Sequence, residues 1–400
     1  MTRPPFEGAD IIRAEGQRFI ARNRSWLHGG HLKVLTAIER CRTAALGGHR
    51  DRCAGCGYEA PSFSFNSCRN RHCPKCQTNA RDKWLAKRSA DLLPVPYVHV
   101  VFTLPHTLAP LAYHNKKLLY GLLFRASAET LLEVARDPKH LGAELGILSV
   151  LHTWGQTLEH HPHMHCVIPA GGLSLDQQRW VPARSKFFLP VRVLSHVFRG
   201  KFVAELQRLW RGKRLCLPGP LKVLKRESTF RAFVRSLYRK KWVVYSKPPF
   251  GGPEHVLHYL ARYTHREAIS NHRITNFANG KVSFRWKDYA RNGEQRVMML
   301  EAHEFLWRFL LHLLPLRFVR IRSFGFLANR RRSAALPLCR RLLAAAGEAS
   351  SRRPAQPPAP PGETARRCPQ CGGPMMVIER LTAQQLQAAL EKGKVAIDSS

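Results

Sequence analysis

Apolar residues recur along the chain at two spacings, one typical of amphipathic helices and the other of strands. The helical spacing predicts helices at residues 11–21, 78–93, 111–135, 195–210, 229–238 and 302–314. Runs rich in β-branched and aromatic residues predict strands at residues 97–104, 146–154 and 242–245. Helices and strands therefore alternate, but this pattern does not establish that the strands are parallel.

Two Asn-Gly pairs interrupt the strand-like sequence between residues 274 and 300. Both Asn279-Gly280 and Asn292-Gly293 favour hairpin turns, because Asn and Gly tolerate the positive φ angles of tight hairpins. The sequence therefore predicts a small antiparallel meander.

Composition divides the chain into three predicted parts. Residues 1–93 form a basic, cysteine-rich unit, and two prolines follow it directly. Residues 97–332 form the main domain, with a basic insertion near residues 173–250. Residues 333–400 are a low-complexity tail with a lone CxxC knuckle, and residues 350–363 have the composition of a disordered linker.

The charge of the chain points to a polyanionic partner. Its 65 Lys and Arg against 27 Asp and Glu give a formal charge of +38, while 44% hydrophobic residues are enough for a globular core. The 8 Trp, 9 Tyr and 20 Phe favour nucleic acid over a membrane surface, because bases stack on aromatic rings. DNA is the expected partner.

No run of about eighteen apolar residues is present, so we do not expect a membrane protein. The first residues also lack the apolar core of a secretion signal. We therefore expect a cytoplasmic, nucleoid-associated protein of a bacterial-type cell, whose cysteines remain reduced.

Two CxxC knuckles predict a structural zinc site, because each places two thiolates on a tight turn as tetrahedral Zn²⁺ requires. The expected ligands are Cys53, Cys56, Cys73 and Cys76. Two residues between the knuckles are possible additional ligands, or members of a second site: Cys68 and His72.

Basic residues beside the second knuckle suggest a surface that contacts DNA, although they could be solubilising charge only. They are Arg69, Arg71 and Lys75. A third knuckle, Cys368 and Cys371, has no obvious partner in the tail. It is either half of a site completed elsewhere, for instance by Cys339, or a relic that binds no metal.

Two histidines separated by one residue, His163 and His165, lie in a strand-like run. Side chains alternate across a strand, so both histidines share one face while Met164 points into the core. Two such imidazoles supply part of a site for Mg²⁺, Mn²⁺ or Zn²⁺. We nominate Gln156 as the third ligand, with His152 and His161 as alternatives. A polar strand face without a metal would show the same pattern.

A Gly-Gly-Pro-Glu run at residues 251–254 predicts the start of a helix that carries Tyr259 and Tyr263 on one face. Tyrosine is a poor nucleophile at its ordinary pKa of about 10, but a cation that polarises a phosphodiester makes its attack feasible. The histidine and tyrosine pairs together predict DNA cleavage that leaves a 5′-phosphotyrosine and a 3′-hydroxyl. The alternative is that both rings only pack in an aromatic stripe.

Several segments together resemble the rolling-circle transposases of the insertion sequence 91 family. They are residues 68–77 (CRNRHCPKCQ), 99–105 (HVVFTLP), 151–173 (LHTWGQTLEHHPHMHCVIPAGGL), 259–274 (YLARYTHREAISNHRI) and 321–329 (IRSFGFLAN).

The resemblance implies an α+β fold: a small zinc-binding domain, then a His-hydrophobic-His nuclease domain on a central antiparallel sheet. It implies that His163 and His165 bind a divalent cation, that Tyr259 and Tyr263 are the nucleophiles, and that the substrate is the single-stranded end of a mobile element. Arg262 and Arg266 lie beside the nucleophiles, where we expect them to contact DNA.

Two other functions fit parts of the sequence. A plasmid replication initiator or relaxase would use similar histidines and tyrosines. A zinc-ribbon protein with a decayed catalytic site would bind nucleic acid without cutting it.

Overall fold

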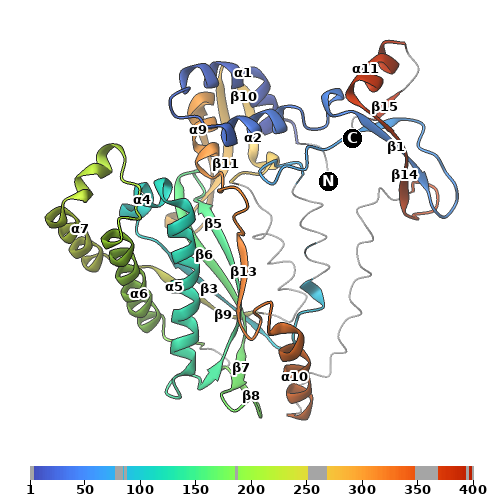
Figure 1. The fold of residues 1–400 in the computed structure, drawn as a ribbon. Helices are drawn as coiled ribbons and strands as arrows, with labels where there is room; N and C mark the ends of the chain where they lie inside the picture. Colours follow the sequence, from blue (N-terminus) through green and yellow to red (C-terminus); the bar gives the residue numbers. More distant parts are fainter. Residues whose placement is uncertain are drawn as a thin grey trace.

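The computed structural model describes residues 4–76, 84, 88–184, 188–250, 268–346, 368–392 and 396–398. A five-stranded sheet with the order β13-β5-β6-β3-β9 forms its centre (Figure 1). All neighbouring strands of this sheet are antiparallel. The strands are β3 (Tyr97–Thr103), β5 (Gly146–Trp154), β6 (His160–Pro169), β9 (Val244–Phe250) and β13 (Ile321–Gly325). The predicted α+β fold with a central antiparallel sheet is confirmed.

Helices cover one face of the central sheet, with α5 and α6 lying along the strands in Figure 1. The helices around this core are α4 (Ala109–His114), α5 (Lys116–Arg136), α6 (Val191–Arg211) and α7 (Glu227–Arg239). Met164 is fully buried in this core, as its place between the two histidines predicts. The opposite face of β6 carries the histidines.

The helix expected over residues 111–135 is interrupted at Asn115. Its side-chain amide donates to the carbonyl oxygens of Leu111 and Cys216, and its oxygen accepts from the Cys216 amide. Asn115 has φ −126° and ψ 36°, outside the helical region, so α4 ends and α5 begins at this residue. A buried side chain that bonds the backbone competes here with helix continuation.

The predicted meander is present as β10 (Ile274–Ala278), β11 (Lys281–Asp288) and β12 (Glu294–Glu301), all antiparallel. Asn279 and Gly280 both have positive φ, 51° and 70°, as a tight hairpin requires. The meander packs against three helices at the top of Figure 1. They are α1 (Gly8–Arg22), α2 (Gly29–Glu39) and α9 (Ala302–Leu311), which ends before Pro315.

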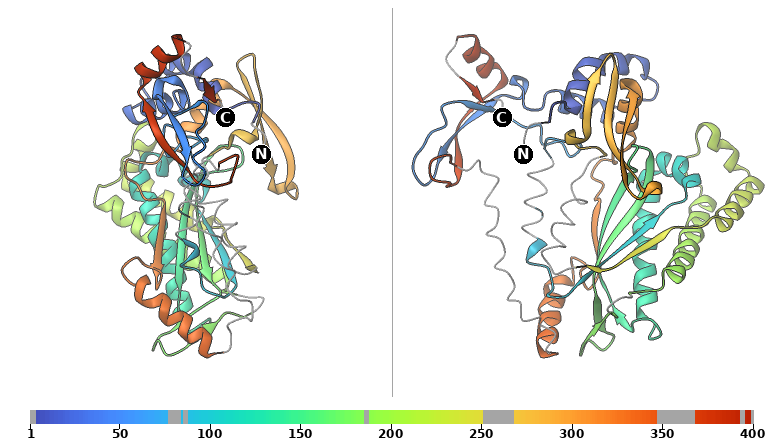
Figure 2. Two further views of the ribbon diagram at one scale, coloured as in Figure 1. Left: turned by 90° about the vertical axis from the view of Figure 1, so that its right-hand side faces the viewer. Right: turned by 180° about the vertical axis from the view of Figure 1, so that it is seen from behind.

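A second sheet combines two strands of the N-terminal cysteine-rich unit with two strands near the C-terminus. Its order is β14-β1-β2-β15, and β14 pairs with β1 along its whole length. The strands are β1 (Gly48–Cys53), β2 (Phe63–Phe65), β14 (Met375–Leu381) and β15 (Ile397–Asp398), beside helix α11 (Ala383–Glu391). Both views in Figure 2 show this unit beside α1 and α2. The C-terminal knuckle is therefore part of a folded unit.

The remaining elements lie around the lower end of the central sheet. A three-stranded sheet is formed by β4 (Ala143–Glu144), β7 (Gly171–Ser174) and β8 (Trp180–Pro182), and α10 (Arg332–Ala345) packs nearby. Most of the helix predicted at residues 78–93 and the linker at 350–363 lie outside the described residues. Among the described residues, no helix is long and apolar enough to cross a membrane.

Candidate metal centres and active site

Eight cysteines form two groups, in each of which all four sulfur atoms lie within 4.8 Å of one another. The first tetrad is Cys41, Cys68, Cys73 and Cys76, and the second tetrad is Cys53, Cys56, Cys368 and Cys371. Sulfur-sulfur distances of 3.4 to 3.6 Å in both exceed the ~2.05 Å of a disulfide. They are close to the edge of about 3.8 Å of a tetrahedron with Zn–S bonds of ~2.3 Å. Both tetrads therefore fit zinc.

The structure corrects the single site predicted from Cys53, Cys56, Cys73 and Cys76. The first two belong to one tetrad and the last two to the other. The reason is the β1–β2 hairpin, in which Gly48 pairs with Phe65 at the base and Cys53 ends the strand. At ~3.4 Å per residue, this end is about 17 Å from the base. One tetrad lies at each end of the hairpin.

Cys41 is the member of the first tetrad that sequence reasoning missed. It is fully buried, follows α2 and has no CxxC spacing that would mark it. Cys68, which was expected only as a possible additional ligand, joins it in the first tetrad, whereas His72 belongs to neither tetrad. Cys339 is buried in α10 and is also absent from both.

The three basic residues beside the second knuckle, Arg69, Arg71 and Lys75, differ in exposure and in whether they contact another part of the chain. The Lys75 ammonium is 2.5 Å from the carboxylate of Glu7, which lies at the start of α1 and is nearly buried. Arg71 donates to the carbonyl oxygen of Phe318 at 2.9 Å and so joins the cysteine-rich unit to the main domain. Arg69 is exposed at a left-handed backbone position, φ 51°. Lys75 and Arg71 thus each contact another part of the chain, and their expected contacts with DNA stay predictions.

Three histidines meet on the sheet face that is opposite α5 and α6. His163 and His165 lie on β6, and His152 lies opposite His163 on β5. Their ligand nitrogens all lie within 4.8 Å of one another. The rings of His152 and His165 are 4.3 Å apart between centroids, and Trp154 stacks on His152 at 4.4 Å. Three imidazoles on one face of two paired strands can hold a divalent cation.

Local hydrogen bonds orient two of these rings. Nδ1 of His163 lies 2.7 Å from the carbonyl oxygen of His161, so it carries the proton and donates. Nδ1 of His165 lies 2.8 Å from Nε2 of His99, a nearly buried residue of β3. Both rings therefore have Nε2 as the nitrogen for a metal. Partners that fix ring orientation in this way are typical of metal-binding histidines.

Burial keeps the imidazoles of His163 and His165 neutral. It lowers the pKa of His163 to about 4 and that of His165 well below its ordinary value, with nearby histidines adding to the second shift. Metal ions bind the neutral form of imidazole. The site is thus ready to bind a cation without first losing a proton at neutral pH.

The structure brings His152 to the histidine pair, whereas the hydrogen bonds of Gln156 lead to the meander. Gln156 lies in the turn between β5 and β6, where its side-chain oxygen accepts from the Lys287 amide and its carbonyl oxygen from Arg273. These bonds connect the turn to the meander. His161, the other alternative, is not part of the cluster.

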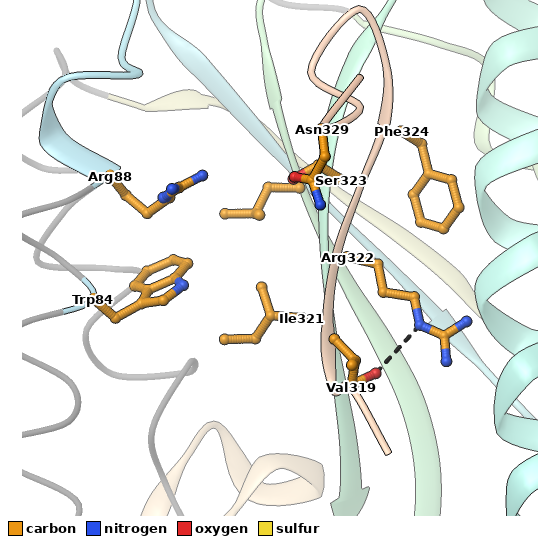
Figure 3. A pocket seen from close by; sticks show the side chains of 9 residues that line it. Trp84, Arg88, Val319, Ile321, Arg322, Ser323, Phe324 and Asn329 are labelled. Carbon is orange, nitrogen blue, oxygen red and sulfur yellow. Dashed lines mark hydrogen bonds between the residues drawn. The ribbon is translucent and has the colours of Figure 1, made fainter. Parts of the chain in front are cut away.

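A cleft of about 410 Å³ lies beside the histidine face, along the edge strand β13 (Figure 3). Trp84 and Arg88 form one wall, and Ile321 and Ser323 form the other. Ile321 pairs with Val150, two residues before His152 on the neighbouring strand. The Trp84 ring offers a surface on which a nucleic-acid base can stack, while the Arg88 guanidinium is paired with the Asp91 carboxylate at 2.8 Å.

Tyr259, Tyr263, Arg262 and Arg266 lie outside the described residues. Their predicted roles as nucleophiles and DNA contacts stay predictions.

Comparisons with known proteins now define the class of this chain. Residues 146–334 match the family described as "Putative transposase", and residues 11–104 match the "Transposase zinc-binding domain". These two regions hold the histidine cluster and the first tetrad. Both matched families are families of transposase domains.

Two relatives define the family further. The chain is 50% identical over 390 residues to "Putative transposase y4qJ" of Sinorhizobium fredii, which covers 95% of this chain and 96% of the relative. It is 30% identical over 320 residues to the "Transposase for insertion sequence element IS801" of Pseudomonas savastanoi pv. phaseolicola, over 77% and 75% of the two chains. The chain belongs to the insertion sequence 91 family of transposases, as its motifs predicted. No solved structure matches it.

Proposed function

We propose that this transposase nicks single-stranded DNA at the end of its element and transfers it through a 5′-phosphotyrosine. The main support is the cluster of His152, His163 and His165 in a domain of the transposase family. These three imidazoles would hold the divalent cation, Mg²⁺ or Mn²⁺, and the bound ion would withdraw charge from the scissile phosphate.

The residues of the chain would do the rest of the chemistry. The phenol oxygen of Tyr259 or Tyr263 attacks phosphorus and forms the new P–O bond, while the bond to the 3′ oxygen breaks. The phenol proton passes through water to the 3′ oxygen, which departs as a hydroxyl. The phosphotyrosine keeps the energy of the diester, so a second 3′-hydroxyl can rejoin the strand without a nucleotide cofactor.

The relatives of this chain favour transposition over replication initiation or conjugative relaxation. A relaxase or initiator shares the histidine and tyrosine chemistry, but both relatives that cover most of this chain are named transposases. Site geometry does not favour the decayed zinc-ribbon alternative, because the histidine cluster has its orienting hydrogen bonds in place.

A covalent-adduct assay tests the proposal. The purified protein is incubated with Mn²⁺ and a labelled single-stranded oligonucleotide that spans the element terminus, and is then denatured. We expect a labelled protein band that nuclease treatment shortens but heat does not remove. Tyr259→Phe with Tyr263→Phe, and His163→Ala alone, should each abolish the band while filter binding persists.

His196→Ala is the matched control, because His196 is exposed on α6, across the sheet from the cluster. It should keep the adduct at the level of the unmodified protein. DNA binding without any adduct would support the decayed binder, and an equally strong adduct on double-stranded DNA would contradict the single-strand proposal.

A further inference from the structure

The two knuckles of the second tetrad have the same local structure, although more than 300 residues separate them. Each Cys-x-x-Cys is followed by a glycine with positive φ, Gly57 at 75° and Gly372 at 69°. Backbone amides donate to sulfur in both, from Gly55 to Cys53 at 3.3 Å and from Gly373 to Cys371 at 3.4 Å. Amides aimed at sulfur stabilise thiolates, the form that binds metal.

The knuckles also face each other at the spacing of metal ligands. Cys53 lies 3.4 Å from Cys371 and Cys56 lies 3.5 Å from Cys368, measured between sulfur atoms. A side chain at Gly373 would place its Cβ 3.1 Å from the sulfur of Cys371 and 3.2 Å from that of Cys53. Glycine there lets the backbone of one knuckle approach the sulfur of the other.

The N-terminal hairpin is shaped to receive the C-terminal segment. Cys53 pairs with Met375, and the amide of Ala54 donates to the carbonyl oxygen of Pro374 at 2.9 Å. Gly47 has φ 72°, and a Cβ there would overlap the carbonyl oxygen of Leu381. Leu386 of α11 is fully buried, next to Gly48. Strand pairing and packing thus converge on the arrangement that brings the knuckles together.

We infer that the second tetrad binds a second structural zinc ion, which holds residues 368–398 to the β1–β2 hairpin. Four thiolates in a tetrahedron suit Zn²⁺. The matched zinc-binding domain spans residues 11–104 and so includes only half of these ligands. The C-terminal unit is therefore part of the zinc-binding region of this chain, and the inference is independent of the cleavage chemistry.

Zinc content of the full-length protein provides the first test. The double variant Cys368→Ser, Cys371→Ser should hold about one zinc fewer per chain than the unmodified protein, as should Cys53→Ser, Cys56→Ser. Because both pairs share one ion, the quadruple variant should lose no more than either double. Cys216→Ser is the control, since Cys216 is exposed and outside both tetrads.

The comparison among variants separates the second tetrad from the first. Adding Cys73→Ser and Cys76→Ser to the quadruple variant should remove about one further zinc. Unchanged zinc content in the Cys368, Cys371 variant would overturn the inference. Iron in place of zinc in the purified protein would overturn the assignment of the metal.

Proteolytic cleavage of the folded protein provides the second test. This test needs no cysteine variant, so poor folding of such a variant cannot affect it. A specific protease site is inserted between residues 350 and 363, and the intact protein is cleaved after purification. The fragment from residue 368 onward should remain bound on a sizing column and be released when a chelator removes zinc. Release in the presence of zinc, or retention after its removal, would show that the ion does not hold the segment.

Discussion

Nε2 of His99 lies 2.8 Å from Nδ1 of His165, with the two ring planes only 4° apart. The two residues come from neighbouring strands, β3 and β6, and share the face that carries the histidine cluster. His99 is 3% exposed, so this bond lies in the protein interior. Because this contact occupies Nδ1 of His165 and leaves Nε2 as the nitrogen that a metal would bind, we propose His99 as a positioning residue.

His99→Ala should therefore weaken Mn²⁺ binding without removing any ligand. Loss of a partner that orients a metal-binding histidine costs about 10- to 100-fold in affinity. Calorimetric titration of Mn²⁺ into the zinc-loaded protein measures the change. His99→Gln, which keeps a hydrogen-bonding group, should restore part of the affinity. A structural role alone would instead lower thermal stability equally in both variants and leave Mn²⁺ affinity intact.

Substitutions of His152 and Gln156 distinguish the two candidate third ligands. We expect His152→Ala to lose Mn²⁺ affinity and adduct formation to the same extent as His163→Ala. Gln156→Ala should retain Mn²⁺ affinity within about twofold, because its side chain bonds the Lys287 amide outside the cluster. The opposite ranking of the two variants would return the ligand role to Gln156.

The pH dependence of metal binding follows from the lowered pKa values. With the pKa of His163 at about 4 and that of His165 also well below its ordinary value, protons do not compete with metal at pH 6. Mn²⁺ affinity should change by less than about twofold between pH 7.5 and pH 6, whereas two imidazoles of ordinary pKa ~6.5 would lose about tenfold. Titrations at several pH values measure this; a midpoint near 6.5 would contradict it.

The lowered pKa of His163 also makes the metal-free protein less stable in acid. The unfolded chain binds protons below about pH 6.5, while the folded His163 stays neutral until about pH 4. The free energy of unfolding should therefore fall as the pH drops through this range. Denaturant unfolding at pH 7 and pH 4.5 would show a smaller fall for His163→Phe than for the unmodified protein.

Substitutions of Cys41 and His72 should have opposite effects on the zinc content of the first tetrad. Cys41→Ser should lose about one zinc per chain, because its sulfur is 3.5 Å from that of Cys76 and belongs to the tetrad. His72→Ala should keep its zinc content, although His72 lies next to Cys73 in the sequence. Loss of zinc in His72→Ala alone would make His72 the ligand.

Gly325 and Gly280 form a matched pair for a test of backbone geometry. Both have positive φ, 61° and 70°, but a Cβ at Gly325 would overlap the carbonyl oxygen of Leu145, whereas nothing lies within 4 Å at Gly280. Gly280→Ala should cost about 1–2 kcal/mol of unfolding free energy, the usual strain of a left-handed residue. Gly325→Ala should cost more than about 3 kcal/mol, as for an overpacked core site. Equal costs in denaturant unfolding would contradict the close approach of β13 and β5.

Local patterns in the sequence predicted most of the described elements. The strand at residues 146–154 has those bounds in the structure, and Asn279-Gly280 makes the expected hairpin turn. His163 and His165 share one face of β6 because strand side chains alternate. The family could also be inferred, since its motifs are short and contiguous. Each of these features depends on residues only a few positions apart.

Long-range pairing determined which ligands meet. The sequence places Cys53 and Cys73 in similar knuckles, yet the length of the β1–β2 hairpin separates them. The pairing of β14 with β1 brings Cys368 to Cys53. His152 lies beside His163 because of the register in which β5 and β6 pair. A shift of β5 by one residue would turn the His152 side chain toward the helices. Spacing along the chain contains no information on register, so the complete ligand sets were visible only in the folded molecule.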